Sequence, residues 1–212
     1  MFTAAPQSLR ERKKAKTRET IVRVALDLFA RNGYSRTTIA QIAEAAEVSP
    51  RTVSTYFPAK EDIVFDISTG TKDRLSNAIR ERPEGQDTMS ALRDWLLTER
   101  KFLDEDHELH VCQRTVIDRE ESLIAHEHAL LREFEVVLAD GIAADLKLAH
   151  SDLEPRMAAA AAMAVFDLLR AEGDSSRTEG EIPVVEELLA MLDQAFAFIS
   201  GGVAALSAQR QA

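Results

Sequence analysis

Glycine and proline are scarce in this chain, and they fall mostly at the joints between segments that carry a helical pattern. The 212 residues contain eight glycines and six prolines. Because both residues are unfavourable inside helices, this placement leaves long stretches free to be helical. No stretch shows the sustained alternation, rich in β-branched residues, that indicates a strand. The pattern predicts an all-α fold, with joints at Gly33, Pro50, Pro58, Pro83, Gly85, Pro155, Gly173, Gly180 and Pro183.

Composition narrows the class of protein further. No apolar run approaches the ~20 residues that a membrane-spanning helix needs, and the N-terminus carries no evident secretory signal. The single cysteine, Cys112, excludes an internal disulfide and a cysteine-based zinc finger. We therefore expect a soluble cytoplasmic protein that makes no contact with a membrane.

The net charge of −10 is unevenly distributed along the chain. Residues 1–60 hold eleven Lys/Arg and five Asp/Glu, a balance of +6, whereas residues 61–212 hold fifteen and thirty-one, a balance of −16. A basic end on an acidic body is typical of a protein that binds DNA through one part of its surface. A solvated basic tail is the alternative that charge alone leaves open.

Three helices are expected within the basic end. The first covers about 17–32 and closes at Gly33, a residue that readily takes the left-handed C-cap conformation. The second begins at Thr38, whose spacing from Gln41 forms a capping box. The third covers about 50–57, where a serine N-cap is followed by a proline suited to the first helical position. The apolar stripe of the first helix is Ile21, Ala25, Leu28 and Phe29.

The second and third of these helices form a helix-turn-helix pattern. In the third helix, Val53 and Phe57 are spaced to anchor it in a core, while polar side chains occupy other positions. Such side chains suit hydrogen bonds to base edges and phosphates. An ordinary pair of helices is the alternative, and the local basic charge favours DNA. The exposed set is expected to be Arg51, Thr52, Ser54, Thr55 and Tyr56.

The same part of the chain resembles a known family. About residues 17–65 are similar in order and spacing to the N-terminal domain of tetracycline-repressor-like (TetR/AcrR) regulators. The resemblance implies an all-helical homodimer that binds palindromic double-stranded operator DNA, most often as a repressor, and releases it when a small molecule binds. It is carried by Leu28-Phe29, Gly33-Tyr34, Thr38, Ile42-Ala43, Val48-Ser49, Tyr56-Phe57-Pro58 and Lys60-Glu61.

We divide the chain into three parts on this basis. Residues 1–16 form a flexible basic arm, residues 17–60 a helix-turn-helix DNA-binding domain, and residues 61–212 a ligand-binding and dimerisation domain. Five of the seven residues from Arg10 to Lys16 are basic. The arm is expected to add phosphate or minor-groove contacts, and a solvated tail is the alternative.

The resemblance also implies roles for individual residues. Thr38 would bind a phosphate through its backbone N–H and hydroxyl, and Lys60 would bind another, in keeping with the preference of helix N-termini for anions. Contacts to bases or phosphates are implied for Arg51, Thr52 and Thr55, and a phosphate contact for Tyr56.

Two positions depart from the family pattern. Position 47, often Gly in this family, is Glu47, so its turn is either less left-handed or mildly strained. Ser54 stands where many members have Tyr or Phe, so the bases of the operator do not follow from the resemblance.

The acidic part predicts five or six further helices. The last two of them carry an alanine-rich segment and a continuous apolar stripe. An intramolecular core is one explanation. We favour a homodimer through these two helices, because one recognition helix reads only a few base pairs and two half-sites need two copies. The helices are expected over about 60–81, 91–102, 111–117, 122–149, 153–172 and 184–207, with a polar stretch at 172–181.

A small-molecule effector and no cofactor are expected for this acidic part. Aromatic and apolar residues at helical spacing suit the walls of a pocket, although simple core packing is the alternative. The candidate pocket residues are Trp95, Phe102, Val111, Arg114, Phe134, Met163 and Phe166.

Other classes of function fit the sequence less well. An enzyme or metal protein would draw on a cluster that begins with Asp104, His107 and His110. However, the Glu-x-x-His and His-Glu-x-x-His motifs and a phosphate-binding glycine loop are all missing from the sequence. We therefore expect no catalytic residue and no metal ligand. A metal-responsive or ligand-independent regulator, and an adaptor that binds a protein instead of DNA, are the remaining alternatives.

Overall fold

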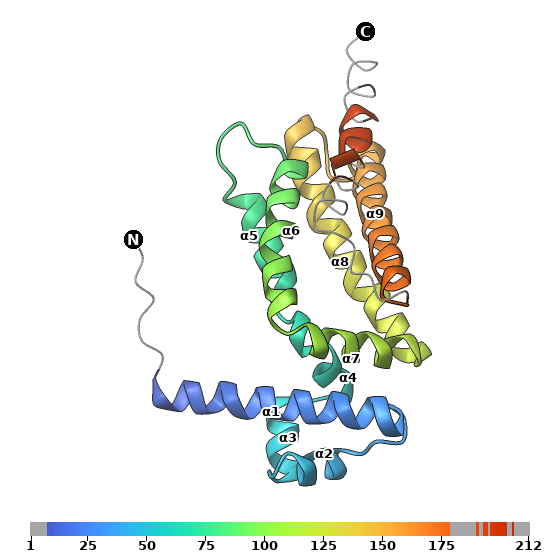
Figure 1. Ribbon diagram of the computed structural model, residues 1–212. Coiled ribbons are helices and arrows are strands. Elements are labelled where there is room, and N and C mark those ends of the chain that lie inside the picture. Colours follow the sequence, from blue (N-terminus) through green and yellow to red (C-terminus); the bar gives the residue numbers. More distant parts are fainter. Residues whose placement is uncertain (1–7, 179–189, 191–192, 195, 203–204, 206–212) are drawn as a thin grey trace. The chain divides into compact units, whose positions relative to one another are not determined.

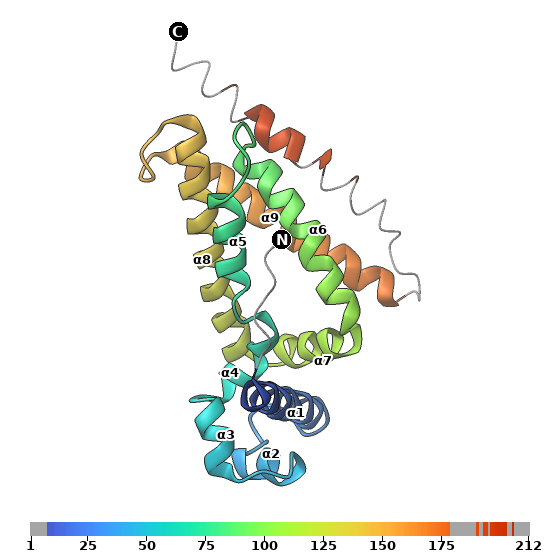
Figure 2. The same cartoon turned by 90° about the vertical axis from the view of Figure 1, so that its left-hand side faces the viewer.

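Helices form every regular element in the described part of the chain (Figures 1 and 2). The computed structural model describes residues 8–178, 190, 193–194, 196–202 and 205, without the side chains of 100–105, 107 and 166–178. The fold is all-α, with an N-terminal helix-turn-helix and a larger helical region, as the sequence predicted. None of the described helices is long and apolar enough to cross a membrane.

The chain divides into two compact units, and the division differs from the predicted domains. The first unit consists of the residues up to 69 together with 102–127. The second unit consists of 70–101 together with the residues from 128 onward. A boundary after residue 60 was expected, yet the first unit also takes in a segment from the middle of the predicted ligand-binding domain.

The first helix, α1 (Leu9–Asn32), begins eight residues before its predicted start. A capping box closes its N-terminus: the Glu11 amide donates to Ser8 Oγ, and the Ser8 amide donates to the Glu11 carboxylate at 2.8 Å. The Arg, Lys and Ala residues that follow are strong helix formers. The segment predicted as a flexible arm therefore continues α1 instead. The buried face is Ile21, Val22, Ala25, Leu26 and Phe29, with the predicted Leu28 only half-buried.

Helices α2 (Ile39–Ala45) and α3 (Pro50–Tyr56) begin at the predicted caps. The hydroxyl of Thr38 accepts a hydrogen bond from the Gln41 amide, which completes the predicted capping box. The hydroxyl of Ser49 accepts from the Thr52 amide at 3.0 Å and closes the N-terminus of α3. Both helices are short, so their positions depend on these caps and on buried anchors.

The turn between α2 and α3 takes the left-handed form. The Val48 amide donates to the Ala43 carbonyl at 2.9 Å, and the Glu47 amide donates to the Glu44 carbonyl at 3.2 Å. This pair of bonds is a Schellman motif, which needs a left-handed residue after the C-cap. Glu47 occupies that position with φ of 55°. Of the two outcomes foreseen for Glu47, the strained left-handed turn is the one observed.

The single helix predicted over 60–81 is broken. Helix α4 covers only Lys60–Val64, a 3₁₀ turn follows over Asp66–Ser68, and α5 (Thr71–Arg80) begins after Gly70 with φ of 79°. The physical reason lies outside the segment. The Val64 carbonyl, which an unbroken helix would offer to the amide four residues later, accepts instead from Gln113 Nε2 at 2.7 Å. The chain leaves the first unit at this break.

The added segment of the first unit is α7 (His107–Asp118) with the first turns of α8 (Glu121–Leu146). This segment makes both polar and ring-stacking contacts with α1, with the turn after α1 and with Phe65 after α4. Asp106 pairs with Arg23 of α1, and Glu120 accepts from Ser35 at 2.9 Å. The ring of His126 stacks on Phe65 with centroids 4.8 Å apart. The contacts that place this segment in the first unit join residues far apart in the sequence.

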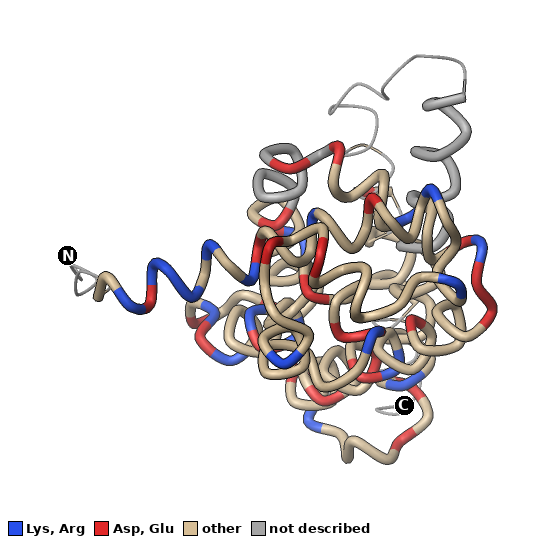
Figure 3. The backbone as a smooth tube through the Cα atoms, turned by 90° about the horizontal axis from the view of Figure 1, so that it is seen from below, with Lys and Arg blue, Asp and Glu red and all other residues tan. Residues whose placement is uncertain are grey.

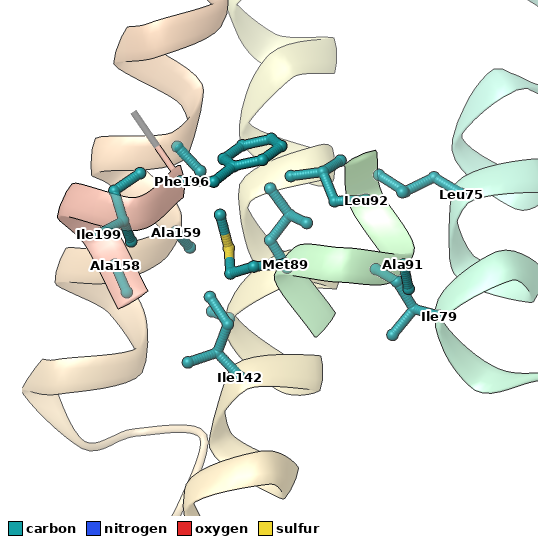
Figure 4. Close-up of a cluster of buried hydrophobic side chains, with 13 residues drawn as sticks. Leu75, Ile79, Met89, Ala91, Leu92, Ile142, Ala158, Ala159, Phe196 and Ile199 are labelled. Carbon is teal, nitrogen blue, oxygen red and sulfur yellow. The ribbon is translucent and has the colours of Figure 1, made fainter. Parts of the chain in front are cut away.

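The second unit is built around an apolar cluster between α5, α6 (Thr88–Glu105), α8 and α9 (Leu153–Thr178), shown in Figure 4. Leu92 and Leu138 are fully buried in it, and Phe196 and Ile199 add apolar surface from the last helical segment. Gly141 of α8 lies where a Cβ atom would meet Thr88 and Ile79 within 2.9 Å. Close packing of α8 against these side chains therefore requires glycine there.

Helix α9 is longer than the sequence predicted. Helix α9 continues to Thr178, whereas a polar joint was expected from residue 172. The polar residues there are compatible with a helix, and Gly173 does not end it. Most of the predicted last helix, over 184–207, lies outside the described residues, although 196–202 are helical.

Candidate nucleic-acid interface

Helix α3 presents a polar face on a buried support. Val53 and Phe57 are 0% and 1% exposed, which confirms the predicted anchors. Arg51, Ser54 and Thr55 are exposed, while Thr52 and Tyr56 are half-buried. The burial of Val53 and Phe57 sets the orientation of α3. The exposed face on the other side of the helix therefore points in one direction, although its own side chains do not anchor it.

Two of the predicted DNA-contacting hydroxyls are already engaged within the protein. Thr52 Oγ1 lies 2.7 Å from Ser49 Oγ, and Thr55 Oγ1 donates to the Arg51 carbonyl at 2.8 Å. The Thr55 hydroxyl thus retains acceptor capacity, which suits the amino groups of bases. The Arg51 guanidinium makes no ion pair or hydrogen bond within the described chain, so its donors are available for a base or a phosphate.

The N-terminus of α2 is closed by its own side chains. Thr38 is exposed, as the predicted phosphate contact requires. However, its backbone N–H donates to Gln41 Oε1 at 2.9 Å and its hydroxyl lies 3.1 Å from the same atom. A phosphate that binds Thr38 through this amide must therefore displace the Gln41 side chain.

Lys60 is turned inward instead of toward a phosphate. Its ammonium donates to the Tyr34 carbonyl at 2.7 Å and to the Thr37 carbonyl at 3.1 Å, and it lies 4.2 Å from the centroid of the Tyr34 ring. Burial lowers the pKa of Lys60, with Glu120 and Glu61 opposing that shift. The phosphate role implied for Lys60 is thus replaced here by a structural one: Lys60 fastens α4 to the turn between α1 and α2.

Tyr34 belongs to the same arrangement. Its hydroxyl bonds to Glu61 Oε2 at 3.2 Å, and its ring packs edge-on against Phe29. Burial and the neighbouring Glu61 carboxylate raise the pKa of Tyr34 well above its ordinary value. The hydroxyl therefore stays protonated and keeps donating to Glu61 over the whole neutral range.

Arg18 of α1 fixes the C-terminal end of α3. Its Nε donates to Asp66 Oδ1 at 2.7 Å, its NH1 donates to the Tyr56 carbonyl at 3.3 Å, and its guanidinium lies 4.5 Å from the centre of the Phe57 ring. One side chain thus joins α1, the last turn of α3 and the 3₁₀ turn after α4. No local pattern predicts this role, because the partners lie 38 and 48 residues away.

The basic residues ahead of the helix-turn-helix lie on helical backbone. Arg10, Arg12, Lys13, Lys14 and Lys16 are all exposed, and Figure 3 shows Lys and Arg following one another along this end of α1. The eight residues that extend α1 lengthen it by about 12 Å at 1.5 Å per residue. Their charges are therefore carried at fixed spacing.

The candidate pocket residues do not form one group. Val111 and Arg114 belong to the first unit, where Arg114 is paired with Asp118 and Glu127. Trp95, Phe134 and Met163 belong to the second unit, and the rings of Trp95 and Phe134 lie 6.4 Å apart. The side chains of Phe102 and Phe166 lie outside the described residues. Trp95, Phe134 and Met163 thus pack against one apolar core, and a pocket formed by them stays a prediction.

Histidines do not converge on a metal site in the part of the chain that the structure describes. Three or more His, Cys, Asp or Glu side chains with the geometry to hold an ion are not found together there. His126 instead stacks on Phe65, and Cys112 is half-buried, with burial raising the pKa of its thiol.

Comparisons with known proteins agree with this geometry. A sequence model described as "Bacterial regulatory proteins, tetR family" matches residues 21–67. The HTH-type transcriptional regulator TcmR of Streptomyces glaucescens is 32% identical over 167 residues, which cover 74% of this chain and 73% of TcmR.

Solved structures share the fold at lower identity. A SmeT–triclosan complex aligns with a TM-score of 0.64 at 20% identity, covering 86% of this chain and 90% of that one. NalD, the secondary repressor of the MexAB-OprM multidrug efflux pump in Pseudomonas aeruginosa, aligns with a TM-score of 0.62 at 21% identity over 88% and 96% of the two chains.

Proposed function

The chain belongs to the tetR family of bacterial regulatory proteins, and on that premise we propose that it binds a palindromic operator as a homodimer and releases it when a small molecule binds. Family membership makes it a DNA-binding transcriptional regulator and not an enzyme. Repression is the proposed effect on transcription, and the cytoplasm is the proposed place of action. The proposal needs an effector but no metal or cofactor.

One observation carries the DNA-binding surface of the proposal. Helix α3 is held by two buried side chains and two contacts of Arg18, while Arg51, Ser54 and Thr55 stand exposed on it. A short helix whose polar side chains are exposed and whose direction is fixed suits the major groove. The balance of +6 over residues 1–60 supplies the attraction to phosphates.

Exposed apolar side chains support the proposed dimer. Leu153 and Met157 of α9 are 63% and 53% exposed, and Phe198 of the last helical segment is 82% exposed. Burying such side chains against a second copy is favourable, at about 25 cal/mol per Å² of apolar surface. Two copies related by a two-fold axis would match the symmetry of a palindromic site.

Release by an effector is proposed as a shift between two arrangements of the dimer. Only one of them spaces the two α3 helices for successive turns of the major groove. An effector that favours the other arrangement by ~1–3 kcal/mol lowers the affinity for DNA by ~5–150-fold. The mechanism requires only this difference in affinity between the two arrangements.

Sedimentation and salt titration test the proposal together. The protein should sediment at twice its chain mass, and its affinity for DNA should fall with salt with a log–log slope of about −0.9 per phosphate neutralised. Phe198→Asp should yield monomers that bind DNA weakly. The matched control is Val136→Asp, which places the same charge on an exposed apolar site of α8 and should leave the dimer intact. Monomeric wild-type protein, or binding that is indifferent to salt, would contradict the proposal.

A further inference from the structure

The burial of apolar side chains in the second unit decreases toward one end of its core. In α6, Ala91 and Leu92 are buried, whereas Trp95 one turn later is only partly buried. In α8, which runs in the opposite direction (Figures 1 and 2), burial falls from Leu138 back to Phe134. The three helices α6, α8 and α9 therefore leave incompletely covered apolar side chains at the same end, and α6 and α8 diverge toward it in Figure 2.

Trp95 carries a polar atom that none of the described residues satisfies. Its Nε1 is buried from solvent and has no hydrogen-bond acceptor among the described residues. An indole N–H is a donor only, so it gains nothing from the apolar side chains around it. A buried donor without a partner is unfavourable, and an acceptor from a bound molecule would relieve that cost.

Two cations of α5 that reach α6 and α8 beside these aromatic residues are already paired. Glu99, one turn beyond Trp95, pairs with Arg74 of α5 at 2.6 Å. Glu133, next to Phe134, pairs with Lys72 at 2.5 Å. The hydrophobic side chains that pack, partly buried, against the core at this end include Leu96, Val137, Met163 and Val165. An anionic ligand group would thus find neither Lys72 nor Arg74 free to pair with it.

We propose that the Trp95 indole N–H is the hydrogen-bond donor that selects the effector, and that the effector is an uncharged, largely apolar molecule carrying a carbonyl or similar oxygen. The inference rests on the proposed function, since it names the chemistry of the effector. The oxygen accepts from Nε1, and the apolar body of the molecule lies against Phe134 and Met163. The unit gains both apolar contact and a satisfied donor when this molecule binds.

Fluorescence provides a direct readout, because Trp95 is the only tryptophan in the chain. The probes are two matched pairs, 1-tetralone with tetralin and indan-1-one with indane, together with tetralin-1-carboxylate as a charged analogue. Each ketone should shift or quench the Trp95 emission and bind about tenfold more tightly than its hydrocarbon. The carboxylate should bind more weakly than the ketone. Equal affinities within both pairs, or no response to either ketone, would overturn the inference.

Two variants separate the hydrogen bond from apolar contact, with affinities measured by calorimetry. Trp95→Phe keeps a ring but removes the donor, so the preference for ketone over hydrocarbon should fall from about tenfold to near unity. Trp95→Phe loses some apolar contacts of the larger ring but also removes the unsatisfied N–H donor. The melting temperature of this variant should therefore fall by no more than the lost apolar contacts account for. Phe134→Leu should weaken ketone and hydrocarbon alike and keep the preference. A preference that survives Trp95→Phe would refute the role of Nε1.

DNA release separates this inference from the proposed function. The anisotropy of labelled DNA is followed while 1-tetralone is added to the full-length complex. Trp95-dependent ketone binding without DNA release would support the inference and contradict effector-driven release. Release by 1-tetralone that Trp95→Phe leaves unchanged would support release and overturn the role of Trp95.

Discussion

The two units of this chain are held together by different kinds of contact. In the first unit, Arg18, Lys60 and Gln113 each reach a backbone carbonyl on another element, at 3.3, 2.7 and 2.7 Å. In the second unit, Arg82 donates to the Gln86 and Ile79 carbonyls at the loop before α6. The helices there meet through the apolar cluster and through side-chain ion pairs such as Arg74–Glu99. Two buried polar atoms there, Thr88 Oγ1 and Trp95 Nε1, lack partners among the described residues.

This difference matches what each unit has to do. A hydrogen bond to a carbonyl has a preferred distance and direction, so a network of such bonds fixes where α3 points. Apolar packing is less directional, and such cores accommodate changes of shape at modest cost. The first unit is therefore suited to hold a surface in one position, and the second is suited to adapt around a guest molecule.

Truncating one core side chain in each unit gives the largest expected effect. Phe57→Ala and Leu92→Ala remove side chains that are 1% and 0% exposed, and each should lower the free energy of unfolding by about 2–5 kcal/mol. In hydrogen exchange, Phe57→Ala should reduce amide protection in α1–α3, and Leu92→Ala should reduce it in α5, α6 and α9. If either variant lowers protection equally in both units, the comparison between them fails.

Removing the free guanidinium of the DNA-facing helix comes next. Arg51→Ala should weaken specific DNA binding by ~1–3 kcal/mol, or ~5–150-fold, because its donors have no role inside the protein. Arg132→Ala makes the same charge change on an exposed site of α8 in the second unit and should leave affinity within about twofold. Anisotropy titrations measure both. Similar losses from the two variants would mean that net charge alone drives binding.

Removing one arginine from a polar contact in each unit tests the difference between the units with smaller changes. Arg18→Ala removes the contacts with Asp66 and the Tyr56 carbonyl, and should cost about 1–2 kcal/mol of stability as well as DNA affinity. Arg74→Ala removes an ion pair with Glu99 in the second unit and should cost less than about 1 kcal/mol, with DNA affinity unchanged. Chemical denaturation and anisotropy give the two quantities. A larger stability loss from Arg74→Ala would reverse the contrast drawn here.

Two non-glycine residues with positive φ in the described part of the chain offer the smallest and most closely matched test. Glu47 and Lys147 both have φ of 55° and each follows a helix, in the first and second unit respectively. Replacing either with glycine should relieve strain and stabilise the protein by about 1 kcal/mol. Only Glu47→Gly should also alter DNA affinity, because it lies in the turn that sets α3. A DNA effect from Lys147→Gly would contradict that assignment.

Local signals were enough to predict the helix-turn-helix. Thr38, Ser49 and Gly33 act as caps within four residues of their partners, so their spacing alone located the helix ends. The early start of α1 also has a local signal, since Ser8 and Glu11 have the spacing of a capping box. The basic composition of residues 10–16 suits a solvated tail, whereas the capping box at Ser8 and Glu11 indicates a helix start.

The remaining differences depend on contacts between distant residues. The break after α4 involves Gln113, 49 residues from its acceptor, and the one local signal within 60–81 is Gly70, which precedes α5. The inward turn of Lys60 depends on carbonyls 26 and 23 residues away. Six of the seven candidate pocket residues are apolar, and apolar character does not tell which compact unit a residue joins.

The reading of a palindromic operator by α3 of a dimer can be tested by selecting genomic DNA fragments on the immobilised protein. The fragments retained at physiological salt are then sequenced. We expect the wild-type protein to enrich one short palindrome, and Arg51→Ala to lose this enrichment while still retaining fragments nonspecifically. Retention without any enriched sequence, or the same palindrome enriched equally by Arg51→Ala, would contradict the claim that α3 of a dimer reads an operator.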